Sequence, residues 1–301
     1  MAWKSLFIAA LALALLSGCS TVPQNPLRAG EGGPAVMKEI MARHDHIIHL
    51  SSPDSDAGKP VLLLLHGATD DPTEMMDIVR VWRGKYDVYL YAYNYHHRVQ
   101  TVAADFVNEL KRLRTENPIG GNETIVVYSY AAIVFRQAVI SSDDPALFAD
   151  ATLIQLVPIA GGSHLARGIK NPVIAWVVSL FSHPTHAVDP YGGFAARLWA
   201  GADNEKFYDT INPSRMHSIV VEGDPHSVAD MADPAIRAHY YNGLGQNVMV
   251  IPKSPDVNHD YFPTQPAALA YLQKLLGPPS IEAGRKLQIA STVLADGYLR
   301  K

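Results

Sequence analysis

Cysteine is almost absent from this chain: Cys19 is the only one among 301 residues, so no disulfide can form within the chain. Lysine and arginine form no rich run and the formal net charge is −4, which argues against nucleic-acid binding. The motifs H-E-x-x-H and C-x-x-C are missing. Two apolar stretches, Leu6 to Leu16 and Pro172 to Phe181, are too short to cross a bilayer as helices. We therefore expect no metal, no cofactor and no nucleic-acid partner.

Histidines, in contrast, occur in close groups. They stand at His44, His46 and His49 and again at His96 and His97. Alternate histidines on a strand share one face, so a metal site is one interpretation. A metal site generally needs three or more convergent ligands with suitable spacing, and the known spacings are absent. We expect solvated or hydrogen-bonded histidines here.

The amino terminus has the pattern of a targeting segment. A positive residue, Lys4, precedes the short apolar segment Leu6 to Leu16, and Ser17-Gly18-Cys19 follows. We predict a signal peptide over residues 1–18. An ordinary secretory signal with a chance cysteine is the alternative.

The residues Leu16-Ser17-Gly18-Cys19 also resemble the lipobox of bacterial lipoproteins. The resemblance implies that Cys19 is acylated, as with palmitate, and becomes the first mature residue. Ser20 follows in place of an aspartate, which implies sorting to the outer membrane, on its periplasmic face. Residues 19–34, rich in proline and glycine, then predict a flexible tether between the lipid anchor and the folded domain.

Short apolar runs alternate with helix-periodic stretches from about Ile47 onward. Residues 61–65 are continuously apolar, as in a strand covered on both faces, and further strands are predicted over residues 87–93, 124–128, 152–159, 218–221 and 247–251. This alternation predicts one α/β domain over residues 35–280, with a mostly parallel sheet and helices on both faces. With 48% hydrophobic residues, the chain can bury a large core.

Helix signals lie between these strands. Asp71-Pro72-Thr73-Glu74 predicts a helix start, with Asp71 as N-cap and Glu74 as capping-box partner. The strongest helical stripe follows the second strand, at Val99, Val102, Ala103, Phe106, Val107, Leu110 and Leu113. A last helix is predicted over residues 266–276.

Residues 166–216 interrupt the alternation as a long insertion. Its apolar stretch Pro172 to Phe181 predicts either a lid helix over an acyl pocket or a buried helix, and the sequence favours neither. Residues 281–301 form a tail of unassigned role.

Ser129 stands between the strand 124–128 and a helical stretch beginning at Ala131. A hydroxyl at such a turn lies at the carboxyl edge of a sheet, near the first amides of a helix. The usual elbow pattern is G-x-S-x-G, but Val127 and Ala131 occupy the glycine positions. We predict that Ser129 is a nucleophile in a strained turn.

A nucleophilic serine needs a base, an acid that orients the base, and oxyanion donors. His259 follows the last predicted strand and is the expected base. Asp224, after the strand 218–221, is the expected acid, with Asp230 and Asp233 as substitutes. The backbone N–H groups of Tyr130 and Ala68 are the expected oxyanion donors.

These residues resemble the α/β-hydrolase family, and within it bacterial lipases and esterases, over roughly residues 61–276. The matching segments are His66-Gly67, Ala131 to Arg136, Val157 to Ser163, and Asn258-His259-Asp260. The resemblance implies an α/β-hydrolase fold and a serine hydrolase that acts on a small-molecule or lipid ester through an acyl-enzyme. The chain departs from the family at the elbow glycines and at Gly223-Asp224-Pro225-His226, where the family often has Gly-Asp-x-Asp.

Three alternatives remain open. Ser163, after the strand 152–159, is a competing nucleophile, and Ser129 is then a small polar residue at a strand end. The altered elbow is also compatible with a catalytically silent envelope lipoprotein that binds a ligand or partner. A thioesterase, amidase or acyltransferase would use the same triad with another acceptor.

Overall fold

The central feature is a sheet whose strands run in the order β1-β3-β2-β4-β5-β6-β7. The computed structural model describes residues 46–50, 58–67, 72–94, 97–116, 122–158, 201–222, 247–252, 257, 259 and 262–278. The strands are β1 (His46–His49), β2 (Val61–Leu65), β3 (Asp87–Ala92), β4 (Thr124–Tyr128), β5 (Thr152–Leu156), β6 (Met216–Val221) and β7 (Val248–Ile251). All pairings are parallel except β1 with β3, so the carboxyl ends of six strands meet at one edge.

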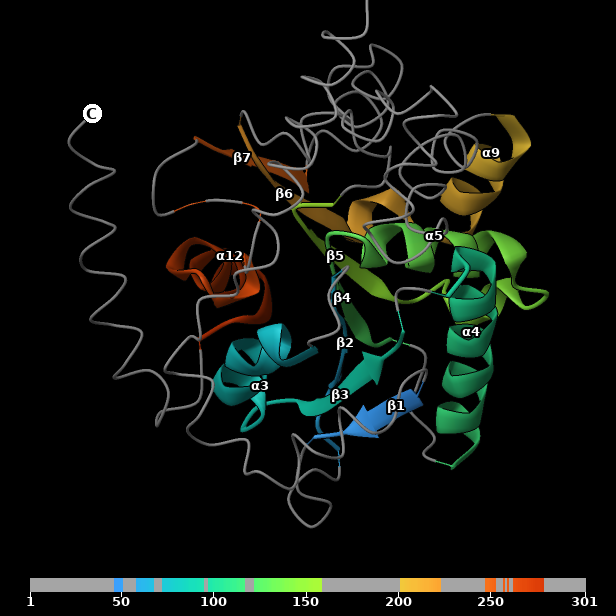
Figure 1. The fold of residues 1–301 in the computed structure, drawn as a ribbon, viewed down its shortest axis with the longest axis horizontal. Helices are drawn as coiled ribbons and strands as arrows, with labels where there is room; N and C mark the ends of the chain where they lie inside the picture. Colours follow the sequence, from blue (N-terminus) through green and yellow to red (C-terminus); the bar gives the residue numbers. More distant parts are fainter. Residues whose placement is uncertain are drawn as a thin grey trace, which may run out of the picture.

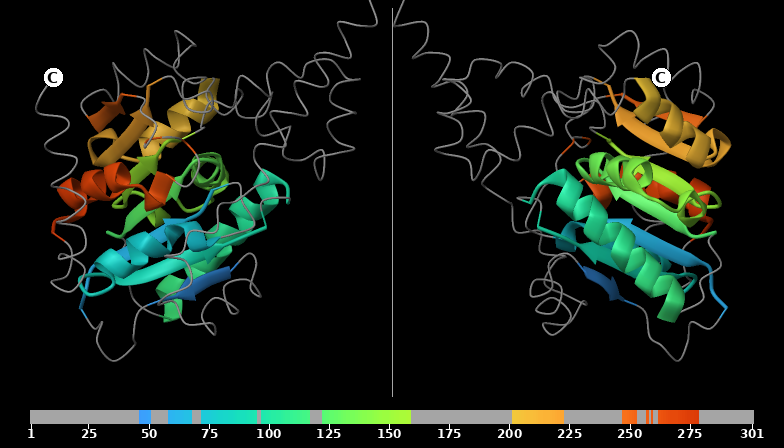
Figure 2. Two further views of the ribbon diagram at one scale, coloured as in Figure 1. Left: turned by 60° about the vertical axis from the view of Figure 1, so that its left-hand side comes forward. Right: turned by 90° about the vertical axis from the view of Figure 1, so that its right-hand side faces the viewer.

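Helices cover both faces of this sheet. In Figure 1, α3 and α12 lie on one side of the strands, and α4, α5 and α9 lie on the other. The right-hand view of Figure 2 shows the second group in front of the sheet. The bounds are α3 (Met76–Trp82), α4 (Val99–Glu116), α5 (Ala131–Ser141), α9 (Gly201–Thr210) and α12 (Pro266–Leu276), with short 3-10 turns η3 (Pro72–Met75), η4 (Pro145–Leu147), η6 (Pro213–Arg215) and η9 (Phe262–Thr264).

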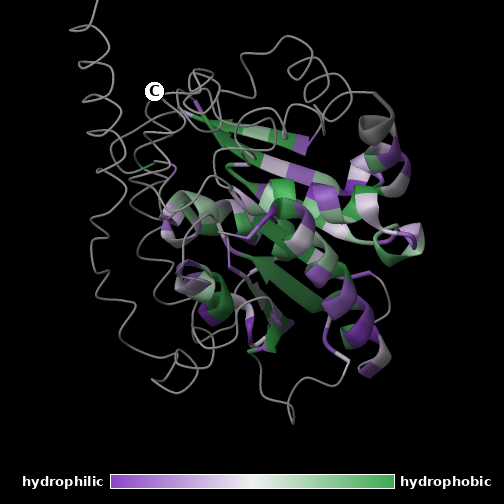
Figure 3. Cartoon of the chain, turned by 45° about the vertical axis from the view of Figure 1, so that its right-hand side comes forward, coloured by the Kyte–Doolittle hydropathy of each residue, from purple (hydrophilic) through white to green (hydrophobic). Residues whose placement is uncertain are grey.

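The sheet separates two hydrophobic cores. Alternate residues of β2 point to opposite faces: Leu63 and Leu65 enter the core under α4 and α5, while Leu62 and Leu64 enter the core under α3 and α12. All four are fully buried, which explains why this strand is apolar at every position. Figure 3 shows the central strands as largely hydrophobic.

The predicted α/β architecture is confirmed. The helical stripe of Val99 to Leu113 is buried along α4, and the helix predicted over residues 266–276 is α12. Four strand ends differ: β3 stops at Ala92, β5 stops at Leu156, β6 begins earlier, at Met216, and β7 begins one residue later, at Val248. The antiparallel direction of β1 was not predicted, because its four residues carry no signal of strand direction.

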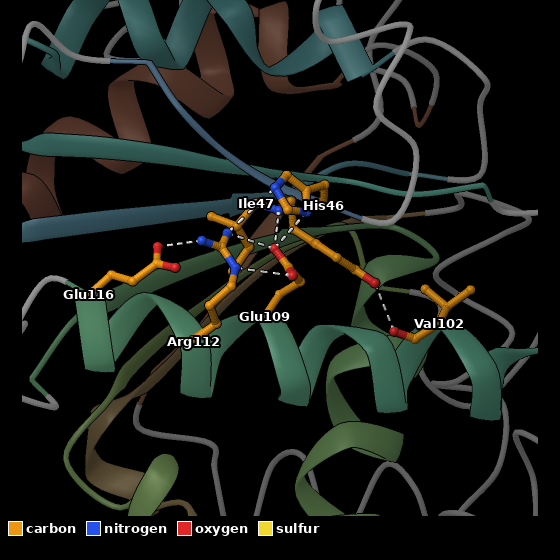
Figure 4. Close-up of polar contacts among 7 residues, drawn as sticks. His46, Ile47, Val102, Glu109, Arg112 and Glu116 are labelled. Atoms are coloured by element: carbon orange, nitrogen blue, oxygen red, sulfur yellow. Dashed lines mark hydrogen bonds and ion pairs between the residues drawn. The ribbon is translucent and has the colours of Figure 1, made fainter.

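An ion-pair network holds β1 at the edge of the sheet. In Figure 4, Glu109 of α4 accepts hydrogen bonds from the backbone N–H of Ile47 and from Arg112, and its Oε2 lies 2.8 Å from His46 Nδ1. Arg112 also pairs with Glu116 one turn further along the helix. At the other end of β1, His49 Nε2 contacts Asp87 Oδ1 at 2.5 Å. We name the set His46, Glu109, Arg112 and Glu116 the edge network.

Several sequence predictions lie outside the described residues. They concern the signal peptide and tether, the apolar stretch 172–181 and the tail 281–301. The downstream end of the predicted insertion is described: α9 packs on α5, where the Arg136 guanidinium lies 4.2 Å from the ring centroid of Phe207. No helix in the described ranges is both long and apolar enough to span a bilayer.

Candidate active site

Ser129 occupies the turn between β4 and α5 in a left-handed backbone conformation. Its φ is +52°, one of two positive values among the described residues other than glycine; the second, +40°, is at Val157 directly after β5. Such a conformation costs a non-glycine residue about 1 to 3 kcal/mol. Two backbone bonds fix the turn, from Ser129 N to the Leu156 carbonyl at 3.0 Å and from Ala132 N to the Ser129 carbonyl at 3.1 Å. The sharp turn places the hydroxyl at the carboxyl edge of the sheet.

The Ser129 hydroxyl contacts an imidazole from the far end of the chain. Ser129 Oγ lies 2.7 Å from His259 Nε2, although the two residues are 130 positions apart. Ser129 is only 5% exposed, and His259 is partly buried. This distance is within the range that proton transfer from a hydroxyl to a base requires.

His259 is itself held through its backbone. Its carbonyl accepts a hydrogen bond from the Tyr128 hydroxyl at 2.6 Å and another from Phe262 N, at the start of η9, at 3.3 Å. Tyr128 is the last residue of β4, directly before Ser129. The residue preceding the serine therefore also fixes the position of the histidine.

The loop after β2 lies against the same tyrosine. A Cβ atom on Gly67 would lie 2.7 Å from Cε1 and 2.8 Å from Cδ1 of the Tyr128 ring, so only glycine fits there. The Gly67 N–H donates to Glu74 Oε1 at 2.6 Å, within a buried environment. This amide therefore has a carboxylate partner in the structure, and the donor predicted in this loop is the next residue, Ala68.

His66, in the same loop, is fully buried and has its own partners. The ring stacks on Tyr93 with centroids 4.1 Å apart, and its Nε2 accepts the Tyr93 N–H at 3.1 Å. Its Nδ1 lies 2.9 Å from the Gly67 carbonyl, and the Tyr93 hydroxyl donates to the His66 carbonyl at 2.5 Å. An imidazole that accepts at Nε2 and donates at Nδ1 is neutral. Its contacts with Tyr93 and Gly67 fix the conformation of this loop.

The elbow without glycines has a simple structural explanation. Val127 is a regular residue of β4, paired with Leu65 and Gln155, and it packs in the core under α5. Ala131 is the first residue of α5 and is buried in the same core. The positive φ falls on Ser129 itself. A β-branched residue at position 127 therefore does not meet the backbone strain of the turn.

Tyr130 lies where an oxyanion donor is expected. It precedes α5 with helical φ and ψ of −58° and −32°, and its carbonyl accepts hydrogen bonds from Ile133 N and Val134 N. The first amides of a helix lack acceptors within the helix, and the helix dipole favours negative charge there. The backbone beside Ser129 is thus suited to an anion.

Other predicted site residues lie outside the described residues. They are Ala68 of the oxyanion loop, the acid Asp224 and its substitutes Asp230 and Asp233, the rival nucleophile Ser163, and the lipidation site Cys19. Strand β6, which precedes Asp224, is described up to Val221 and ends at the same edge of the sheet as β4. In the described part of the chain, no group of three or more histidine, cysteine or acidic side chains is arranged to hold a metal ion.

The sequence patterns did not predict the roles of two residues in this region. The Tyr128 hydroxyl and the Glu74 carboxylate each bind a loop backbone next to the Ser129–His259 pair. A signal for Tyr128 did exist, because a buried tyrosine at the end of an apolar strand needs a partner for its hydroxyl. Glu74 was assigned to a capping box, and its bond to Gly67 depends on tertiary structure.

Comparison with solved structures defines the fold. The mature form of the lipase BlEst2 from Bacillus licheniformis superposes with a TM-score of 0.54 at 16% identity, covering 78% of this chain and 99% of that one. Its propeptide form matches at 18% identity with a TM-score of 0.48, over 60% of this chain and 40% of that one. An esterase from Pyrobaculum calidifontis matches at 12% identity with a TM-score of 0.48, over 85% and 89%.

No protein-family model matches the sequence, and no curated protein matches it significantly. The likeness to solved structures, at these identities, concerns the fold. Together with the strand order and the crossovers, it shows that this chain adopts the α/β-hydrolase fold. The residues that carry activity have to be argued from the site.

Proposed function

We propose that this protein is a serine hydrolase that cleaves carboxylic esters through an acyl-enzyme on Ser129. The observation that carries the proposal is the 2.7 Å contact between Ser129 Oγ and His259 Nε2, made by a serine with φ of +52°. A strained serine in contact with a partly buried histidine at the carboxyl edge of an α/β-hydrolase sheet has the arrangement of a nucleophile and its base. The structural likeness to a lipase agrees with this choice.

The proposed reaction has two stages. Ser129 Oγ attacks the ester carbonyl carbon while its proton passes to His259 Nε2, and the oxyanion is stabilised by the backbone N–H groups of Tyr130 and Ala68. The tetrahedral intermediate collapses, the C–O bond of the ester breaks, and the alcohol leaves with the proton from Nε2. Water then attacks the acyl-enzyme with His259 again as base, which releases the acid. Asp224 is the proposed acid that orients His259.

A fluorophosphonate probe tests the nucleophile directly. Ser129→Ala should abolish labelling and lower ester hydrolysis by at least about 10³-fold, and His259→Ala should slow both to a similar extent. Ser142→Ala is a matched control, because Ser142 is also 5% exposed and lies at the opposite end of α5. Labelling that persists in Ser129→Ala would contradict the assignment of Ser129 as the nucleophile. A panel of esters of increasing acyl length would define the substrate class.

We also propose that the protein is anchored to the bacterial envelope through acylated Cys19. The support is the sequence pattern of the amino terminus, with its apolar segment and single cysteine. In a host that processes lipoproteins, the wild type should incorporate an alkyne analogue of palmitate and fractionate with membranes, whereas Cys19→Ala should do neither. Unchanged incorporation in Cys19→Ala would contradict the anchor.

A further inference from the structure

The Tyr128 side chain contacts two loops that are far apart in the sequence. Its hydroxyl donates to the His259 carbonyl at 2.6 Å, in the loop that carries the proposed base. One edge of its ring lies against Gly67, in the loop that carries the proposed oxyanion donor. Both loops extend beyond the carboxyl ends of their strands, where the sheet no longer supplies hydrogen bonds. The Tyr128 side chain, which extends from the end of β4, therefore connects two loops that no strand pairing joins.

Packing alone does not account for this tyrosine. Tyr128 is 3% exposed and its ring belongs to the apolar core under α3 and α12, where phenylalanine would fill the same space. A buried hydroxyl is costly unless it has a hydrogen-bond partner. Here the partner is the backbone of the residue whose imidazole meets Ser129. The Tyr128 hydroxyl thus holds His259, and a displacement of His259 would change its contact with Ser129.

We propose that Tyr128 is a positioning residue that sets the distance between His259 Nε2 and Ser129 Oγ. This inference rests on the proposed function, because it assigns a role within the same site. Tyr128 makes its contact at the His259 carbonyl, several bonds away from Nε2, so it does not take part in proton transfer. A small shift of that carbonyl moves the whole imidazole, and a misplacement of about 1 Å at a reacting group can cost about 10²-fold in rate.

The expected effect is moderate because His259 has a second support. Its carbonyl also accepts the Phe262 N–H at 3.3 Å, which remains when the tyrosine hydroxyl is removed. Tyr128→Phe should therefore keep the loop in place but loosen it. We expect kcat to fall by about 10- to 100-fold while KM changes less than about twofold, because the substrate is bound by other groups.

The chain offers a matched control at the opposite edge of the sheet. Tyr86, just before β3, is also buried, and its hydroxyl donates to the Leu276 carbonyl at 3.1 Å. Tyr86→Phe removes the same kind of bond, from a tyrosine hydroxyl to a backbone carbonyl, far along the strands from Ser129. It should lower the midpoint of thermal unfolding about as much as Tyr128→Phe and leave kcat unchanged.

The experiment combines kinetics with histidine NMR. Hydrolysis of a short-chain ester is measured for the wild type, Tyr128→Phe and Tyr86→Phe, and the imidazole resonances of His259, assigned by comparison with His259→Gln, are recorded for each folded protein at the same pH. Tyr128→Phe should shift the His259 resonances, and Tyr86→Phe should not. The spectrum is independent of turnover, so it also detects positioning in a protein that proves inactive.

The outcomes separate the two proposals. Shifted His259 resonances in Tyr128→Phe, with a wild type that hydrolyses no ester, would support the positioning role and contradict the proposed function. An active wild type whose kcat and His259 resonances are the same in Tyr128→Phe and Tyr86→Phe would overturn the positioning role and leave the proposed function standing.

Discussion

Two histidines in this molecule make hydrogen bonds of nearly equal length in very different surroundings. His259 Nε2 lies 2.7 Å from the hydroxyl of Ser129, and His46 Nδ1 lies 2.8 Å from the carboxylate of Glu109. His259 lies beyond β7 and is held at its backbone by neutral donors. His46 lies within β1 and faces a carboxylate that Arg112 already neutralises. The first histidine faces a weak acid that can give up its proton to a base, and the second faces an ion pair that is already complete.

The difference shows how the fold divides its polar groups. The edge network joins two regular elements, β1 and α4, so its contribution is to stability. The site around Ser129 is built from strand ends and loops and contains a strained residue, and under the proposed function it contributes to reactivity at some cost in stability. Substitutions at the site should change reactivity more than stability, and substitutions in the edge network should do the opposite.

The largest expected effect is at Ser129, where two substitutions distinguish the role of the hydroxyl in hydrolysis from the effect of the strained backbone on stability. Both Ser129→Ala and Ser129→Gly should abolish hydrolysis. Ser129→Gly should also raise the free energy of unfolding by about 1 kcal/mol, because glycine adopts φ of +52° without strain, whereas Ser129→Ala keeps the strain. Denaturant unfolding of the three proteins measures the difference. Equal stability of the glycine and alanine variants would show that the turn stores no strain.

A smaller effect on hydrolysis is expected at Gly67, where one substitution should change both the rate of hydrolysis and the free energy of unfolding. Gly67→Ala should lower the free energy of unfolding by about 2 kcal/mol, because the new methyl group overlaps the Tyr128 ring, and it should slow hydrolysis as the ring moves. Gly58→Ala is the control: its φ is +87° with open space around the Cβ position, so it should cost about 1 kcal/mol and leave hydrolysis unchanged. Equal activity of the two variants would contradict a link between this loop and the site.

Sequence patterns predicted the regular elements well because each carries its own signal. Strand β2 is apolar at every position because both of its faces are buried. Helix α4 carries a single apolar stripe because only one of its faces is buried. Ser129 was predicted from its place between β4 and α5, and His259 from its place after the last strand. The resemblance to α/β-hydrolases supplied the order in which nucleophile, acid and base follow one another.

The contacts between distant loops were not predictable in this way. The Tyr128 hydroxyl reaches a carbonyl 131 residues later, and the Glu74 carboxylate meets an amide that only the folded loop brings near. Neither contact leaves a periodic pattern, because each involves a single side chain and a backbone atom. The replaced glycines also do not indicate which residue of the turn has the positive φ, and the structure places it on Ser129.

The smallest expected effect is in the edge network, and it depends on pH. Burial alone would raise the pKa of Glu109, but hydrogen bonds from Arg112 and from the Ile47 N–H, with the electrostatic attraction of His46 and Arg112, hold it below its ordinary value of 4.5. A lowered pKa in the folded protein stabilises the fold above pH 4.5, and this stabilisation is lost as the pH falls through the folded pKa. Glu109→Gln should therefore cost about 1 kcal/mol at pH 7 and progressively less below pH 4.5.

The control for this prediction is an exposed ion pair between Lys111 of α4 and Asp143, which follows α5. Asp143→Asn breaks the exposed ion pair with Lys111 and should leave the unfolding curve at pH 7 unchanged, because solvent already screens that pair. Both variants should label with a fluorophosphonate as fast as the wild type. A Glu109→Gln penalty that stays constant down to pH 3 would show that the carboxylate charge does not stabilise β1. Slower labelling of Glu109→Gln would instead show that the edge network and the site are coupled, because α4 packs both on β1 and on α5, the helix that follows Ser129.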